Sequence, residues 1–389
     1  MRVRRRGWLF LAILGLGVAA FTIVWLSATR MPQGTQPAFG GSYIEGLTGA
    51  PARIDPLFAA QNAVDASMTA LVFSGLTRLD DKGQPFPDLA ESWDISPDGR
   101  TYTFHLRRGV VWHDGAPFSA DDVVFTYALA RSPALRAAPT VAQALAGATV
   151  TKLDALTLKV DLAQPYAPLL AYLSFGILPQ HLLAQTDPTA MFDAPFNQRP
   201  VGTGPYRLDQ LSPDRAVFVA NAAYHLAQPY IQRLELRFFR DDGALMAAVR
   251  DHALDGAFFA GGVNAGDYQY LQARKDLRLS SLDSGEVTFI YFNLSLPLFQ
   301  DRRLRQALTY ALDRDAIVDE ALAGSSPRAD SPLPRGSWAY SPSLDRYDSD
   351  ATVAAALLDD AGWRAGAGGV RAKGGTTLSF TLSTNSDPV

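Results

Sequence analysis

Cysteine is absent from this chain of 389 residues. Its absence excludes disulfide bonds, thiol catalysis and zinc sites built on cysteine. It does not locate the protein, and nothing about it argues against an oxidising compartment.

Patterns that carry catalytic or metal chemistry are also missing. The five histidines include no HExxH or other metal-pair spacing, and no GxSxG nucleophile elbow occurs. His113 and Asp114 are adjacent, so on a strand they would point to opposite faces, and Asp114-Gly115 is typical of a turn. We therefore predict a protein that is not an enzyme, with no metal site and no cofactor. A secreted hydrolase is the disfavoured class.

Excess positive charge is lacking outside the first residues. The formal net charge is −4, although four arginines precede residue 8. An acidic body argues against nucleic-acid binding, which needs a positive surface. The Gly-Thr-Gly at 202–204 fits neither phosphate-loop spacing, and Pro205 blocks the helix that would face a phosphate, so we interpret it as a tight connector.

One long apolar run is present. Residues 8–27 carry no charge and are long enough to span a hydrocarbon core of ~30 Å as a helix. The basic residues before the run predict that the chain after Ser27 lies outside the cell membrane. A cleaved signal peptide is the competing interpretation, although its apolar core is usually about 7–15 residues. We predict an anchor or signal segment at 1–30 and a Gly- and Pro-rich tether at 31–41.

Strand and helix patterns alternate along the rest of the chain, which predicts an α/β fold with a partly parallel sheet. A turn at Ser96-Pro97-Asp98-Gly99 separates two strands, and Ser119 is expected to cap a helix whose apolar face includes Val123, Val124, Tyr127 and Ala128. Further helices are expected at 65–73, 166–175, 179–184, 243–250, 267–274, 301–322 and 350–361. Strands are expected at 42–47, 101–106, 148–153, 156–160, 206–211, 216–220, 233–239, 256–259, 277–282, 287–294 and 378–382.

Several ordered motifs carry a family resemblance. They are LAESW, SPDGRTYTFHLRRGVVWHDG and PFSADDVVFTY between residues 89 and 127, PVGTGPY at 200–206, then FN, DRRLRQALTYALDRDAIV and LLDDAGW. Together they resemble the family 5 solute-binding proteins of ABC importers, the group that binds dipeptides, oligopeptides or nickel. Relatives continue well past the position of Val389, so we expect a C-terminally truncated chain.

The resemblance implies a bilobed, periplasmic-binding-protein-like (type II) fold with an extra inserted domain. Lobe I would comprise 42–78 and 201–283, the inserted domain 79–200, and the start of lobe II 284–389. The implied function is extracytoplasmic capture of a small solute, most simply a di- or oligopeptide, by a monomer that serves membrane permease subunits and their ATPase. The alternatives are a nickel complex or an oligosaccharide as ligand, or the sensory ectodomain of a membrane protein.

The resemblance also places the ligand between the lobes, with a hinge near Ser284-Gly285. In peptide-binding relatives an aspartate that meets the ligand's amino group lies beyond the region seen here, so no residue of this chain receives that role. The candidate ligand-binding residues, chosen by their place in the fold, are Glu45, Leu47, Thr48, Gly285, Glu286 and Thr288.

Overall fold

The structure is a computed structural model, and it describes residues 37–80, 82–135, 137–280, 287–322, 327–333, 335 and 339–384. The expected anchor or signal run at 8–27 lies outside that part of the chain. Within the described residues, no helix is long and apolar enough to cross a bilayer.

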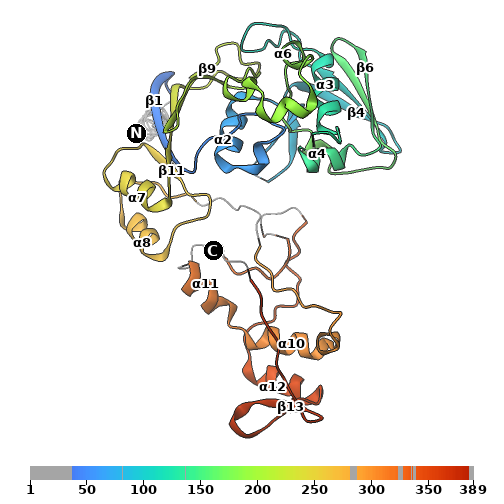
Figure 1. Cartoon of the computed structure of the whole chain (residues 1–389), viewed down its shortest axis with the longest axis vertical. Coiled ribbons are helices and arrows are strands. Elements are labelled where there is room, and N and C mark those ends of the chain that lie inside the picture. The colour runs from blue at the N-terminus through green and yellow to red at the C-terminus, as the bar shows by residue number, and fades with distance from the viewer. Residues whose placement is uncertain are drawn as a thin grey trace, which may run out of the picture.

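A five-stranded mixed sheet forms one side of the N-terminal body (Figure 1). Its order is β11-β1-β10-β9-β8, with β1 parallel to both neighbours and β9 antiparallel to β10 and β8. This order confirms the predicted partly parallel sheet. The strands are β1 (Gly40–Thr48), β8 (Tyr206–Leu211), β9 (Arg215–Ala220), β10 (Ile231–Phe239) and β11 (Gly256–Phe258).

A four-stranded antiparallel sheet forms the other side of this body, in the order β4-β5-β7-β6. Side chains of β5 alternate, and Phe104 and Leu106 on its inner face are buried as period two requires. The turn at Ser96 to Gly99 is confirmed, since the Gly99 N–H donates to the Ser96 carbonyl at 2.8 Å. The strands are β4 (Ala90–Ile95), β5 (Thr101–Leu106), β6 (Thr149–Asp154) and β7 (Thr157–Asp161).

Helix α3 (Ala120–Ala130) begins after Ser119 as predicted, and its start is a capping box. The Ser119 side chain accepts from the backbone of the first turn, and the Asp122 carboxylate accepts from the Ser119 N–H at 2.9 Å. The predicted apolar face is partly wrong, because Val123 and Tyr127 are buried whereas Ala128 is exposed. The buried stripe continues through Leu129 and Ala130 instead.

One hydrophobic core joins the two sheets, and α2 (Ala63–Val72) lies between them (Figure 1). Leu47 of β1, Met68 of α2 and Phe104 of β5 belong to this core. Shorter elements close the body: β2 (Thr77–Leu79), β3 (Pro85–Pro87), α4 (Pro139–Ala144), α5 (Leu169–Tyr172), α6 (Gln180–Leu183), α7 (Asp242–Arg250), α8 (Ala265–Ala273) and the 3-10 turns η1 (Ala59–Gln61), η2 (Pro188–Asp193) and η3 (Pro195–Gln198).

The helix predicted at 166–175 is wrong in length. Only α5 forms there, and Pro168 stands directly before it. Proline disfavours helical backbone at the residue before it, which accounts for the late start of this helix.

The elements after residue 287 form a separate group in Figure 1. Helix α10 packs on α12, with Leu304 and Ala354 buried. Gly362, at φ 89°, ends α12 as predicted. The elements are α9 (Pro297–Gln300), α10 (Arg302–Ala311), α11 (Arg314–Leu322), α12 (Ala351–Asp360), β12 (Arg364–Ala365), η4 (Ala367–Gly369), β13 (Arg371–Lys373) and β14 (Thr376–Thr377).

The single helix predicted over 301–322 is wrong, because it divides into α10 and α11. Leu312 has extended backbone (φ −91°, ψ 121°), and the Asp313 carboxylate accepts from the Ala316 N–H at 2.9 Å. A short acidic side chain that bonds to the backbone ahead of it favours a helix start over a helix interior.

Three predicted strands do not form in the described residues. They are 277–282, of which the structure describes 277–280, then 287–294 and 378–382. Their apolar side chains are largely exposed, with Tyr291 at 85% and Leu382 at 70%. An alternating or apolar run provides a face to bury, but a strand also needs a neighbouring strand to bond its backbone N–H and C=O groups.

Candidate ligand-binding site

Three strands of the mixed sheet end at the same edge. Thr48 of β1 is level with Phe239 of β10, and Leu47 is level with Phe258 of β11. In open α/β sheets, ligands bind outside the carboxyl ends of parallel strands. We therefore take the edge formed by Thr48, Phe239 and Phe258 as the candidate site.

Thr48 is held by the helix that follows β10. Its hydroxyl donates to the Asp242 carboxylate at 2.5 Å, and Asp242 lies in the first turn of α7. Asp241 caps the same helix by accepting from the Ala244 N–H at 2.8 Å. The dipole of α7 favours both carboxylates there, so the Thr48 hydroxyl is oriented by a fixed group. The sequence did not reveal this partner, which lies 194 positions away.

The predicted residues of β1 do not share one face. All three lie within the strand rather than after it, and alternation puts Glu45 and Leu47 on one face and Thr48 on the other. Leu47 is 5% exposed and packs in the core, so its side chain is not available to a ligand. On the opposite face a Cβ at Gly46 would lie 2.4 Å from Leu245 Cδ1, which shows how closely α7 approaches.

Glu45 is half-buried and forms no hydrogen bond or ion pair within the described residues. Burial raises the pKa of Glu45 above its usual value. The negative charges of Glu45 and Asp255 in turn add to burial in raising the pKa of the Tyr43 phenol. A desolvated carboxylate without a cation beside it is a group that a positively charged ligand atom would stabilise.

Of the three candidates at the expected hinge, the structure describes only Thr288. Gly285 and Glu286 lie outside the described residues. Thr288 is exposed and belongs to no strand. Among the described contacts, none brings Thr288 to Glu45 or Thr48.

The connector PVGTGPY is explained by packing. The Gly204 N–H donates to the Val72 carbonyl at the end of α2 at 2.8 Å, and a Cβ at Gly202 would lie 1.9 Å from the same oxygen. His113 also bonds to the connector. Its Nδ1 accepts from the Gly202 N–H at 3.2 Å, and its Nε2 lies 3.1 Å from the Gly204 carbonyl. This arrangement requires a neutral ring with the proton on Nε2.

His113 and Asp114 are not a catalytic dyad. His113 bonds to the connector, whereas Asp114 lies 2.8 Å from His181 Nε2. The structural interpretation made from the sequence is confirmed. Among the described residues, no three His, Asp or Glu side chains are grouped so that they could hold a metal ion.

Asp55 is a buried acid that the sequence did not single out. It is fully buried, its Oδ1 accepts from the Leu57 N–H at 2.8 Å, and its Oδ2 has no hydrogen-bond partner in the described structure. Burial raises the pKa of Asp55 to about 7. An Asp-Pro pair reads as a loop break in sequence, and only the fold shows that this loop is buried.

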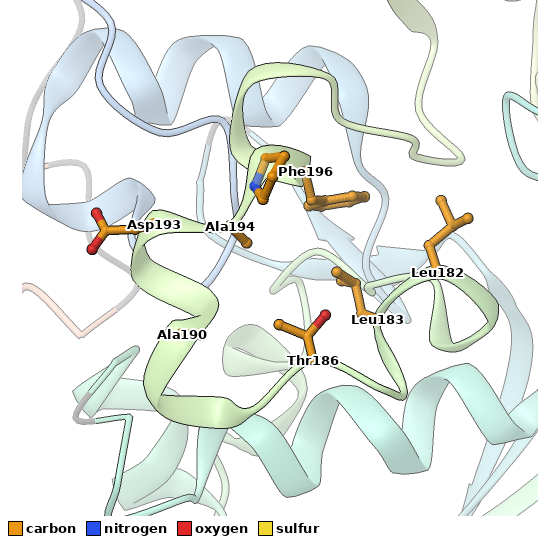
Figure 2. Close-up of a pocket in the computed structure, with 8 residues that line it drawn as sticks. Leu182, Leu183, Thr186, Ala190, Asp193, Ala194 and Phe196 are labelled. Carbon is orange, nitrogen blue, oxygen red and sulfur yellow. The ribbon is translucent and has the colours of Figure 1, made fainter.

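Two surface hollows lie elsewhere on the N-terminal body, and none of the predicted ligand-binding residues lines either of them. The first, of about 460 Å³, is mainly apolar (Figure 2). Leu183 and Phe196 line it, while Figure 2 shows the Asp193 carboxylate pointing away from the other lining side chains. The second, of about 500 Å³, lies beside His113 and the connector.

Comparison with known proteins identifies the family. The sequence profile described as bacterial extracellular solute-binding proteins, family 5 middle, matches residues 84–389. The chain belongs to this family. Its members are extracellular solute binders, which confirms that the chain is not an enzyme.

Relatives and solved structures agree with that assignment. The chain is 30% identical over 365 residues to the oligopeptide-binding protein AppA of Bacillus subtilis, covering 90% of this chain and 65% of AppA. It is 29% identical over 340 residues to the dipeptide-binding protein of Escherichia coli, covering 82% and 63%. The structure of NikZ from Campylobacter jejuni with Ni(L-His) matches at a TM-score of 0.69 and 33% identity, covering 87% and 66%. The chain therefore spans about two thirds of the length of these relatives.

Proposed function

We propose that this protein is the substrate-binding component of an ABC importer, which captures a di- or oligopeptide and delivers it to membrane permease subunits. The observation that carries the proposal is the family match over residues 84–389. AppA and the dipeptide-binding protein of Escherichia coli, named as peptide binders, support a peptide as ligand.

In this proposal the ligand lies between two lobes. Lobe I comprises 42–78 and 201–283, lobe II begins at 284, and 79–200 is an inserted domain. Glu45 and Thr48 would contact ligand from the edge of β1, Leu47 only through its backbone, and Gly285, Glu286 and Thr288 from the hinge. The unpaired Glu45 carboxylate would meet a positively charged group of the ligand, such as a peptide ammonium.

The mechanism is capture without chemistry. A ligand that contacts both lobes binds the closed state more tightly than the open one, and it shifts the population by that difference in affinity. The closed monomer then docks on the permease subunits, whose transport the ATPase drives. The apolar run at 8–27 would hold the protein at the outer face of the membrane or direct its export.

A ligand panel tests the proposal. Full-length chain is titrated with di- to pentapeptides, with the nickel–histidine complex and with oligosaccharides, and unfolding is followed in each case. A ligand at 100 times its Kd should stabilise the protein by about 2.7 kcal/mol. Stabilisation by nickel–histidine or by a sugar, with none by any peptide, would contradict the peptide assignment.

Variants test the site. Glu45→Gln should weaken binding of the best peptide about tenfold, because it removes a desolvated charge from the ligand's cation. Glu91→Gln is the matched control, since Glu91 is an exposed strand residue of the other sheet. Equal affinities of the two variants would exclude Glu45 from the site.

A further inference from the structure

The second hollow lies where three segments of the chain meet. Its walls come from the loop at 113–114, the start of the connector at 198–201, and strand β8. The volume of about 500 Å³ is within the range of small-molecule sites. It does not include the edge of β1, so it is separate from the proposed peptide site.

The positive charges in this hollow are unpaired. Arg199 and Arg207 both line it and are exposed, and neither guanidinium forms an ion pair or hydrogen bond within the described structure. Arg207 is close enough to His113 for its positive charge to add to burial in lowering the pKa of that imidazole. Both arginines therefore line the hollow without an ion-pair partner of their own.

The negative charges in the hollow are already engaged. Asp114 lies 2.8 Å from His181 Nε2 and also accepts from the Ala116 N–H at 3.1 Å. Asp209 lies 3.9 Å from an Arg233 guanidinium nitrogen, outside the hollow. Arg199 and Arg207 are therefore the charged side chains of this hollow that have no partner within the described structure.

The apolar part of the hollow's lining should strengthen an ionic contact between an arginine and a bound anion. Val201, Leu208 and Leu211 are half-buried and line the same hollow. Apolar walls lower the local dielectric constant, so a guanidinium attracts an anion more strongly there than on an open surface. Arginine also matches the planar geometry of carboxylate and phosphate oxygens with two parallel N–H donors.

We propose that this hollow is a second ligand site, which binds a small oxyanion, carboxylate or phosphate, between Arg199 and Arg207. The site is lined partly by the start of the connector and by His113, whose imidazole bonds to Gly202 and Gly204 of that connector. A bound anion opposes the field of Arg207 at His113 and therefore favours the protonated imidazole. The proposal does not depend on which solute the protein transports.

Calorimetric titration of the full chain with citrate and, separately, with inorganic phosphate tests the site. Saturable binding of either anion at roughly millimolar concentration or below is expected, and the stronger of the two identifies a carboxylate or a phosphate site. The double variant Arg199→Gln/Arg207→Gln should weaken this binding at least tenfold. Arg302→Gln, which alters an exposed and unpaired arginine of α10, should leave it unchanged.

A second measurement, the NMR signals of the His113 imidazole, tests whether the anion binds beside that residue. The imidazole resonances of His113, assigned with a His113→Asn variant, should shift as the anion saturates, and their titration midpoint should rise. Absence of saturable binding to the unaltered chain would overturn the proposal. So would equal binding by the double variant and by Arg302→Gln, or saturation without any change at His113.

Discussion

Two ionisable side chains, the buried Asp55 and the half-buried His113, make the stability of the fold depend on pH. Asp55 is fully buried with one oxygen unpaired, and His113 is held neutral between two glycines of the connector. Neither role is visible in sequence, because both depend on burial and on partners far along the chain. Their effects on stability have opposite signs.

Asp55→Asn should stabilise the protein at high pH. Burial raises the pKa of Asp55 from 3.8 to about 7, so the folded chain holds this proton more tightly than the unfolded chain. The contribution to stability is complete below the unfolded pKa and is lost as pH rises through about 7. The free energy of unfolding of the variant, relative to wild type, should therefore rise between about pH 5 and about pH 8 by up to a few kcal/mol.

Denaturant unfolding of both proteins at the two pH values measures that difference. Glu91→Gln, which alters an exposed carboxylate on β4 that has no ion-pair partner in the described structure, serves as the control and should show no such rise. A constant difference between Asp55→Asn and wild type would show that Asp55 is ionised in the folded chain.

His113 should make the protein less stable in mild acid. Burial lowers the pKa of His113 below 6.5, partly opposed by the Gly204 carbonyl. A group whose folded pKa is lowered contributes stability above its unfolded pKa, and that stability is lost as pH falls through the folded pKa. Protonation of Nδ1 would also place two donors, the imidazole and the Gly202 N–H, against each other.

His113→Asn should remove this acid sensitivity while costing stability near neutral pH. Thermal unfolding between about pH 7 and about pH 5 is the measurement, and His105→Asn, which alters a histidine of β5, is the control. If the two variants lose melting temperature in parallel with wild type, His113 does not titrate in this range.

At the level of elements, packing at the connector explains the PVGTGPY motif. The end of α2 approaches Gly202 and Gly204 so closely that neither position has space for a side chain. The sequence correctly predicted a tight connector, because Gly and Pro break regular structure. It could not predict which helix the connector touches.

Gly202→Ala should destabilise the protein by at least about 2 kcal/mol, because the new Cβ would meet a backbone oxygen that cannot rotate away. Gly261→Ala is the matched control, since nothing lies within 4 Å of a Cβ there. Urea unfolding of both variants measures the difference. Similar midpoints would mean that α2 and the connector separate at little cost.

Prediction of elements succeeded where local signals agree. The capping box at Ser119, the Asp98-Gly99 turn and the alternation of β5 are each specified by residues within a few positions. It failed at 301–322, where a competing cap at Asp313 divides the helix. It also failed for three strands whose pairing no local signal can specify.

At the scale of the whole molecule, the backbone amides of the two-sheet core and those of the segment after residue 286 should differ in protection from hydrogen exchange. Backbone amides of β1 are bonded on both sides, to β10 and β11. The amides at 287–292 donate no hydrogen bond in the described structure, and Tyr291 is 85% exposed. Local opening should therefore cost little in this segment.

Hydrogen exchange measured by mass spectrometry should show 287–292 exchanging within the shortest labelling time and residues 43–47 protected for much longer. Addition of the best peptide from the ligand panel should slow exchange at 287–292 if the segment contacts ligand. Protection of 287–292 equal to that of β1, without ligand, would show that the segment pairs as a strand after all.

The sequence by itself determined much of the local structure and the family. Composition excluded thiol chemistry, ordered motifs indicated the solute-binding family, and caps, turns and alternation predicted most elements of the two sheets. Tertiary structure alone decided that Leu47 belongs to the core, that Asp242 orients Thr48, that Asp55 is buried and that Arg199 and Arg207 share a hollow. The physical reason is range: caps and turns are made by neighbours in the chain, whereas burial and charge pairing depend on which distant segments the fold brings together.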